Sequence, residues 1–141
     1  MTVIAWDGKT LAGDRQTTHD NTPTLTRKVY RIRHPRGGHV LIGCSGHSGD
    51  CQEYIRAALG EITEKPNFSS LLVLLIDQQG KAWGMNERLV WWAIDAPYWS
   101  IGSGCDFALG AMHAGKTARE AVLIASKLDK SCGLGVDVVR L

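Results

Sequence analysis

The first fourteen residues place the strongest constraint on the fold of this chain. Residues 2–6 and 9–12 are two short runs rich in β-forming residues, and Asp7 and Gly8 separate them. An Asp-Gly pair between two such runs predicts a two-residue turn, and therefore a hairpin that starts at Thr2. Because Thr2 is small, we expect removal of Met1 to leave a threonine with a free α-amine. A hydroxyl nucleophile and a base would then lie on one residue.

A second hairpin and an early helix are expected after the first hairpin. Residues 15–24 are rich in Thr, Asp, Asn and Pro, which predicts a loop that leaves the sheet and returns to it. Residues 28–33 alternate polar and apolar side chains like a strand, residues 34–38 form a turn, and residues 39–45 pair back. A Gly- and Ser-rich entry and a closing glycine then predict a helix over residues 46–59.

The second half of the chain continues with strands and ends with a pair of helices. Residues 70–77 are a continuous apolar run, which is typical of a strand buried on both faces. Further strands are expected at residues 81–85, 89–94, 98–101 and 135–141, and helices from Gly104 to about Ala114 and from Thr117 to about Lys130. Thr117 and Glu120 have the spacing of a capping box. Strands with segregated helices predict an α+β fold, with two sheets faced by helices.

Composition limits the classes of protein to which the chain can belong. Its 141 residues, of which 44% are hydrophobic, fit one domain over residues 1–141. The formal net charge is only +2, and the local basic excess is confined to Arg27, Lys28, Arg31, Arg33 and Arg36. Nucleic acid is therefore not expected as the main partner.

The chain is also expected to lack targeting signals and cofactors. Asp7, Lys9 and Asp14 argue against a signal peptide, and the longest apolar run, residues 71–76, is too short to cross a membrane. We therefore expect a cytoplasmic protein. The four cysteines and five histidines have neither CxxC nor other ligand-like spacing, so we expect no disulfide, metal or other cofactor.

Thr2 and five further segments together form a pattern that covers almost the whole chain. These segments are Ala-Gly-Asp-Arg-Gln-Thr at residues 12–17, Arg-Lys-Val-Tyr-Arg at 27–31, Gly-Cys-Ser-Gly-His-Ser-Gly-Asp at 43–50, Ile-Gly-Ser-Gly at 101–104 and Asp-Lys-Ser-Cys-Gly at 129–133. In order and approximate spacing the pattern resembles the proteasome β-subunit and HslV branch of the N-terminal nucleophile (Ntn) hydrolases. The resemblance implies a four-layer αββα sandwich and a threonine peptidase.

The resemblance also implies a role for each of the matching residues. Thr2 would be the nucleophile, with its own α-amine as base, since such an amine has a pKa near 8. Lys28 would supply a charge that lowers the proton affinity of this neighbourhood, and Asp14 would pair with Lys28 and hold it. An ammonium in a partly buried cleft is retained in its charged form when it is paired.

Three further residues would complete the site that the resemblance implies. Gly46 would present its backbone N–H to the developing oxyanion at the entry of a helix. Ser103 and Asp129 match the positions that hydrogen-bond around the threonine amine. Cys132 stands where the family has a serine, and the chain is shorter than typical members of the family.

The resemblance also implies partners, and the sequence leaves two alternative functions open. The resemblance implies a homo-oligomeric ring that hides the sites, with peptides or unfolded protein as substrate and an ATP-dependent unfoldase as a partner. The tryptophans at 91, 92 and 99 are candidates for the interface. One alternative is a proteasome-like shell protein with a degenerate site. The other is a phosphate-binding P-loop, because residues 110–117 fit G-x-x-x-x-G-K-T, although no strand is expected to precede them.

Overall fold

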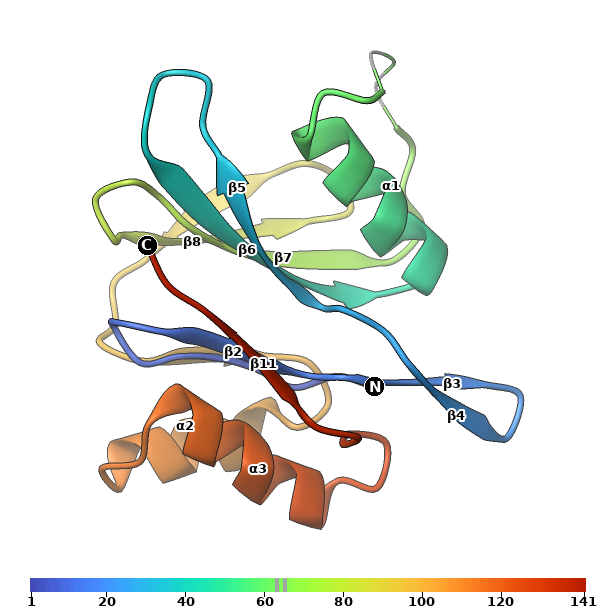
Figure 1. Ribbon diagram of the computed structural model, residues 1–141, viewed down its shortest axis with the longest axis vertical. Helices are drawn as coiled ribbons and strands as arrows, with labels where there is room; N and C mark the ends of the chain where they lie inside the picture. Colours follow the sequence, from blue (N-terminus) through green and yellow to red (C-terminus); the bar gives the residue numbers. More distant parts are fainter. Residues whose placement is uncertain (63, 65) are drawn as a thin grey trace.

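Three antiparallel sheets and three helices make up the part of the chain that the structure describes, residues 1–62, 64 and 66–141, in a computed structural model (Figure 1). One sheet has the order β10 (Trp99–Ile101), β1 (Ile4–Trp6), β2 (Leu11–Asp14) and β11 (Val136–Val139). Another has the order β5 (Val29–Arg33), β6 (His39–Gly46), β7 (Leu71–Ile76), β8 (Ala82–Asn86) and β9 (Trp91–Ile94). The third pairs β3 (Gln16–His19) with β4 (Thr22–Leu25), and the helices are α1 (Ser48–Ala58), α2 (Cys105–His113) and α3 (Ala118–Leu128). The predicted α+β class is confirmed.

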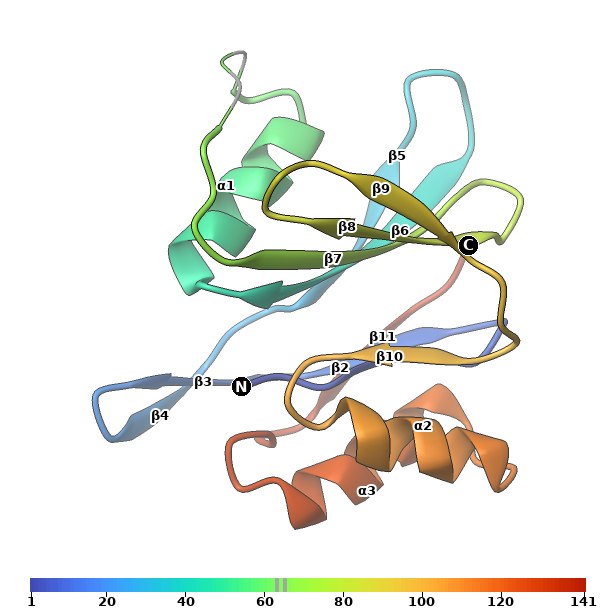
Figure 2. The ribbon, with the colours of Figure 1, turned by 180° about the vertical axis from the view of Figure 1, so that it is seen from behind.

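The two larger sheets face each other, and helices cover their outer faces (Figures 1 and 2). Alternation along β1 explains the arrangement, because successive side chains of a strand point to opposite faces. Ile4 packs into the core between the sheets, whereas Val3 and Ala5 pack against α2 and α3. On the other sheet, α1 lies over a third core that includes Val73 of β7. The strand β7 is buried on both faces, as its continuous apolar run predicted.

The first hairpin forms, but its turn is longer than predicted. Trp6 pairs with Leu11, so four residues lie between the strands instead of two. The carboxylate of Asp7 explains the difference, because it accepts hydrogen bonds from the backbone N–H groups of Lys9 and Thr10. It also accepts one from the N–H of Ala118, the first residue of α3. A side chain that bonds its own turn in this way replaces the tight two-residue geometry.

The predicted loop at residues 15–24 is wrong, because this segment forms the hairpin of β3 and β4. Thr17 pairs with Thr24, and Thr18 with Pro23. Threonine is β-branched and favours strands, so its β-propensity is realised here despite its polarity. Asp20 provides the turn with a positive φ of 54°. The hairpin extends from the body of the molecule (Figure 1).

The predicted helices form, with one difference at the start of α1. The helix begins at Ser48, and Gly46 belongs to the end of β6. The capping box of α3 is confirmed, since the Thr117 hydroxyl accepts from the Glu120 N–H and the Glu120 carboxylate accepts from the Thr117 N–H. The P-loop interpretation is wrong, because residues 110–113 of the motif lie inside α2, so a helix leads into the motif where a phosphate loop requires a strand.

Candidate active site

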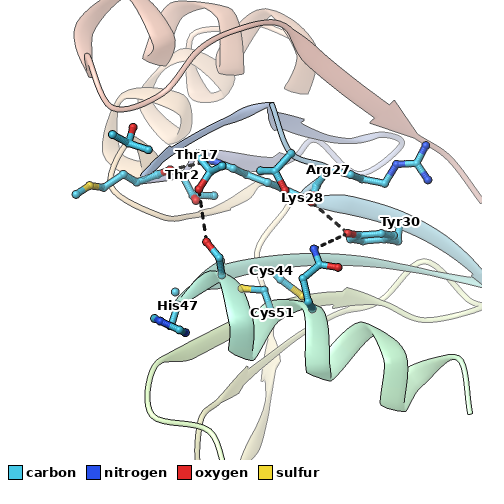
Figure 3. A pocket seen from close by; sticks show the side chains of 14 residues that line it. Thr2, Thr17, Arg27, Lys28, Tyr30, Cys44, His47 and Cys51 are labelled. Atoms are coloured by element: carbon cyan, nitrogen blue, oxygen red, sulfur yellow. Dashed lines mark hydrogen bonds between the residues drawn. The ribbon is translucent and has the colours of Figure 1, made fainter. Parts of the chain in front are cut away.

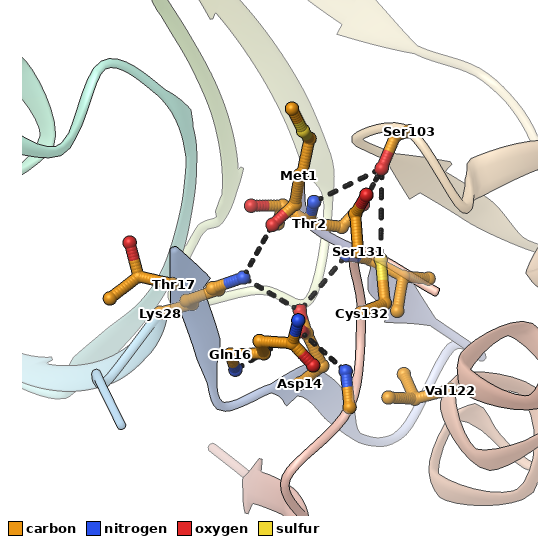
Figure 4. A network of polar contacts seen from close by, with 12 residues as sticks. Met1, Thr2, Asp14, Gln16, Thr17, Lys28, Ser103, Val122, Ser131 and Cys132 are labelled. Carbon is orange, nitrogen blue, oxygen red and sulfur yellow. Dashed lines mark hydrogen bonds and ion pairs between the residues drawn. The ribbon is translucent and has the colours of Figure 1, made fainter. Parts of the chain in front are cut away.

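A fully buried carboxylate, that of Asp14, lies at the centre of the candidate site (Figure 4). Its Oδ1 accepts from the Val3 N–H at 3.0 Å and from Lys28 Nζ at 2.9 Å. Its Oδ2 accepts from the N–H groups of Gln16 at 3.2 Å and Gly133 at 3.1 Å. A charge in the interior is tolerated only when it is paired and hydrogen-bonded, and both conditions are met. Asp14 therefore ties β1, β2, the segment before β5 and the segment before β11 to one point.

The ammonium of Lys28 is directed by Asp14 toward the N-terminus of the chain. Lys28 directly precedes β5, and its side chain is only 7% exposed. Besides its bond to Asp14, Nζ donates to the backbone carbonyl of Met1 at 2.8 Å (Figure 4). The positive charge thus lies at the peptide group that joins Met1 to Thr2.

The backbone of Thr2 is fixed from the opposite side by the segment between β10 and α2. The Thr2 N–H donates to Ser103 Oγ at 3.2 Å, and the Thr2 carbonyl accepts from the Gly104 N–H at 3.1 Å. Gly102 lies directly against this carbonyl with a φ of 97°, and a Cβ on it would be 2.2 Å from the Thr2 oxygen. Only glycine fits there, because both the backbone angle and the close approach exclude a side chain.

The Ser103 hydroxyl connects the nitrogen of Thr2 to a carboxylate. Ser103 Oγ donates to Asp129 Oδ2 at 2.6 Å, while the Ser131 N–H donates to Asp129 Oδ1 at 2.9 Å. The bond from Ser103 is the main cause that lowers the pKa of Asp129, and burial opposes it. Burial raises the pKa of Cys132 to about 11, so its thiol remains protonated and donates to Asp129 at 3.4 Å. Asp129 is therefore an anion one hydroxyl away from the Thr2 nitrogen.

A pocket of about 240 Å³ lies on the open side of Thr2 (Figure 3). Thr2, Lys28 and Gly46 all contribute to its lining. Thr17 of β3 and Ser48 of α1 approach each other across it, with their hydroxyl oxygens 3.4 Å apart. The pocket therefore lies between the small hairpin and the start of α1, and it has the size of a site for a small side chain.

The glycine at position 46 has a conformation that other residues rarely adopt. Its φ is 122°, and a Cβ on it would be 2.3 Å from the carbonyl oxygen of Ser70. The next residue, His47, donates its N–H to that same oxygen at 2.9 Å. The expectation that Gly46 opens a helix is wrong, because Gly46 ends β6 and α1 begins two residues later. It does lie in the lining of the Thr2 pocket.

The structure brings the six predicted site residues to one corner of the molecule. Asp14 and Lys28 form one hydrogen-bonded group, and Ser103 and Asp129 form another, with Thr2 between them. Gly46 meets Thr2 across the pocket. No role was predicted from the sequence for Gly102, although it belongs to the Gly-Ser-Gly pattern, or for the cysteines that line the pocket.

Two kinds of feature, a metal-ligand group and a membrane-spanning helix, are not found among the described residues. Over residues 1–62, 64 and 66–141, no group of His, Cys, Asp and Glu side chains is arranged to hold a metal ion. In the same part of the chain, no helix has the length and apolar character needed to cross a bilayer.

Solved structures match this chain over nearly its full length. No protein-family model matches the sequence, and no curated protein matches it. The structure of HslV from Trypanosoma brucei has 21% sequence identity and a TM-score of 0.69, covering 98% of this chain and 97% of that chain. BPH from Thiobacillus denitrificans, solved in complex with epoxomicin, has 17% identity and a TM-score of 0.68, with 99% and 97% covered.

A second type of structure, Anbu (ancestral β-subunit), matches as well. The helical assembly of the Anbu complex from Pseudomonas aeruginosa has 12% identity and a TM-score of 0.74, covering 100% of this chain and 81% of that chain. The chain therefore has the fold shared by HslV and Anbu. The resemblance to the HslV type of proteasome-like Ntn hydrolase, predicted from the sequence segments, is confirmed at the level of the fold.

Proposed function

We propose that this chain is a threonine endopeptidase in which Thr2 becomes the N-terminal nucleophile after Met1 is removed. One observation carries the proposal: the nitrogen of Thr2 is hydrogen-bonded to the Ser103 and Asp129 pair, while a buried ammonium, that of Lys28, lies at the carbonyl just before it. A shell protein would have no need of a buried ion pair at this carbonyl, because such pairs are often neutral or unfavourable for stability.

The first chemical step would be attack by the Thr2 hydroxyl on the carbonyl carbon of a peptide bond. A free α-amine has a pKa near 8, so at neutral pH about a tenth of it is unprotonated and can accept the hydroxyl proton, directly or through one water. The positive charge of Lys28 would favour the unprotonated amine and stabilise negative charge on the oxygen. The Ser103 hydroxyl, oriented by Asp129, would hold the amine in place.

In the second step the α-amine would give the hydroxyl proton to the leaving nitrogen and the C–N bond would break, which releases the amine product and leaves an ester between Thr2 and the acyl half of the substrate. Gly46 would donate its backbone N–H to the oxyanion, a type of contact that typically contributes two to three orders of magnitude in rate. Water, deprotonated by the same α-amine, would then cleave the ester. One residue thus acts as nucleophile and as base in both steps.

Removal of Met1 would be the activating event. While Met1 is attached, the nitrogen of Thr2 belongs to a peptide bond and cannot accept a proton at physiological pH. In that form Lys28 is bonded to the Met1 carbonyl. The unprocessed chain would therefore be folded but inactive.

The assembly that we propose follows from the fold and from an exposed aromatic edge. The order α1, five-stranded sheet, four-stranded sheet, α2 with α3 is the order that a four-layer αββα sandwich requires, within one domain over residues 1–141. Trp91 and Trp92, in the edge strand β9, are 43% and 38% exposed. Large exposed aromatics are typical of protein interfaces. We propose a cytoplasmic homo-oligomeric ring to which an ATP-dependent unfoldase delivers unfolded protein; sedimentation showing only a monomer would contradict it.

Hydrolysis of an unfolded protein by the processed chain tests the activity. Thr2→Ala removes the hydroxyl and keeps the amine, and it should reduce turnover by more than about a thousandfold. Thr2→Ser keeps both groups and should remain active. Lys28→Met, which keeps most of the length of the side chain and removes its charge, should be less stable but still folded, and nearly inactive. A Thr2→Ala chain with turnover close to wild type would refute the assignment of the nucleophile.

The runner-up function is a proteasome-like shell protein with a degenerate site. Two observations favour it: Thr2 is only 7% exposed, and Cys132 replaces the serine that the resemblance implies. A shell protein would still form the proposed assembly, and no substitution at Thr2 would change its behaviour.

A further inference from the structure

Two thiols meet in the wall of the pocket beside Thr2. Cys44 lies near the end of β6, and Cys51 lies in the first part of α1, seven residues later. The helix packs back on the sheet, so Cys51 packs against the cluster that contains Cys44, and both line the pocket (Figure 3). Cys44 is buried and Cys51 is half-buried. The fold therefore places two free thiols in one core cluster and one pocket wall, with one of them nearer to solvent.

The two thiols differ in reactivity. The neighbouring sulfur of Cys44 is the main cause that lowers the pKa of Cys51; the charge of Lys28 lowers it further, while burial and the charge of Asp50 oppose the shift. The neighbouring sulfur of Cys51, together with burial, raises the pKa of Cys44. The pKa values of Cys105 and Cys132 are also raised, chiefly by burial. Because the thiolate is the reactive form, a lowered pKa and partial exposure favour Cys51 over Cys44, Cys105 and Cys132 as the thiol that an oxidant attacks first.

We propose that Cys44 and Cys51 form a dithiol modification site, which hydroperoxides oxidise to a disulfide in the wall of the Thr2 pocket. Size permits this reaction, because a water molecule occupies only about 30 Å³ of liquid and a hydrogen peroxide molecule is little larger, whereas the pocket measures about 240 Å³. The pocket also brings the oxidant directly to Cys51.

The chemistry proceeds in two balanced steps. The Cys51 thiolate attacks one oxygen of hydrogen peroxide, so that an S–O bond forms, the O–O bond breaks and, with one proton, water and a sulfenic acid result. The Cys44 sulfur then attacks the Cys51 sulfur, so that the S–S bond forms and the S–O bond breaks. The departing hydroxide takes the Cys44 proton and leaves as water. Two thiols are oxidised by two electrons in total, and one peroxide is reduced to two waters.

The oxidation should also control the peptidase site. Both sulfur atoms line the same pocket as Thr2, so joining them changes the wall against which a substrate side chain would lie. This consequence rests on the proposed function, whereas the formation of the disulfide does not.

Peptide mass spectrometry of the intact, reduced chain treated with hydrogen peroxide tests the site directly. No Lys or Arg lies between residues 37 and 55, so trypsin leaves both cysteines on one peptide, residues 37–56. After alkylation with N-ethylmaleimide, this peptide should carry no label and should have lost two hydrogens. The peptides with Cys105 and Cys132 should carry the label. Dithiothreitol should restore both thiols at residues 44 and 51.

Single substitutions give the controls. Cys51→Ser should leave Cys44 open to alkylation after peroxide, and Cys44→Ala should leave a sulfenic acid on Cys51 that dimedone traps. Cys105→Ser should behave as wild type. The proposal predicts that the pair is oxidised at least about tenfold faster than Cys105. It is overturned if the pair remains fully alkylated while Cys105 or Cys132 is oxidised, or if Cys51→Ser does not protect Cys44.

Hydrolysis by the same samples separates this inference from the proposed function. Peroxide should inhibit the wild-type chain reversibly and should not change the rate of the Cys51→Ser chain relative to the same variant without peroxide. If the reduced wild-type chain hydrolyses nothing, the proposed function fails, but the mass measurement still decides the dithiol site. If the disulfide forms and hydrolysis is unchanged, the site exists and the control of the peptidase is refuted.

Discussion

Substitution of Asp14 by asparagine should destabilise this chain more than any other change of one functional group in the candidate site. The carboxylate is fully buried and accepts four hydrogen bonds, one of them from the Lys28 ammonium. Asparagine removes the negative charge and keeps only one accepting oxygen. Its NH₂ group would face N–H donors, either the pair from Gln16 and Gly133 or the group formed by Val3 and Lys28.

The magnitude follows from the burial of the partner. Lys28 is 7% exposed, so the ammonium would remain in the interior without a counter-charge. Removing one partner of a buried pair typically costs about 3–5 kcal/mol, which is a large share of a total stability of about 5–15 kcal/mol. At a denaturant slope of roughly 2 kcal/mol per M, the urea midpoint should fall by roughly 2 M.

Equilibrium unfolding in urea at neutral pH measures this effect, and Asp137→Asn is the matched control. Asp137 also pairs with a basic residue, Arg15, but that pair is exposed. Exposed pairs contribute little, so the midpoint of Asp137→Asn should stay close to that of wild type. If Asp14→Asn shifts the midpoint no more than Asp137→Asn does, the buried pair of Asp14 and Lys28 does not stabilise the fold as we describe.

Three further outcomes are expected. Gly102→Ala should lose roughly 1–3 kcal/mol of stability from backbone strain alone, and the collision of its Cβ with the Thr2 carbonyl should add to that loss. Gly110→Ala in α2, where the added Cβ meets open space, should be neutral or stabilising, and thermal unfolding compares the two variants. Asp129→Asn should be less stable than wild type at pH 7. The difference in unfolding free energy should shrink as pH falls from about 4 through the lowered pKa of Asp129, because the ionised carboxylate, which the folded state favours, is then protonated. Intact mass of chain isolated from its own cell should be lower by one methionine, and chain that retains Met1 should fold with the same thermal midpoint but hydrolyse nothing.

Local signals in the sequence were sufficient for much of the fold. The capping box at Thr117 and the apolar run of β7 each depend on residues close in sequence, so their patterns determine the element directly. The hairpin of β3 and β4 was missed because polarity indicated a loop, while the β-branched threonines in fact favour strands. The turn at Asp7 was misjudged because its carboxylate bonds the N–H groups of Lys9 and Thr10, which closes a longer turn than the Asp-Gly pair indicates.

The candidate site was predictable only as a set of residue types at approximate spacings. Asp14, Lys28 and Ser103 were singled out by their resemblance to a family pattern, and the structure adds which atoms meet. The proximity of Cys44 and Cys51 was not predicted, because a spacing of seven residues does not show how the helix that follows β6 packs back on the sheet.

Covalent capture by a peptide epoxyketone tests most directly whether Thr2 is a nucleophile with its own base. The ketone carbon takes a hydroxyl and the epoxide takes the adjacent amine, so a closed adduct forms only where both groups lie on one residue. In chain without Met1, we predict an adduct on the tryptic peptide of residues 2–9, identified by mass, and none in Thr2→Ala or in chain that retains Met1. No adduct on the processed chain, or an equal adduct on chain that retains Met1, would contradict the account.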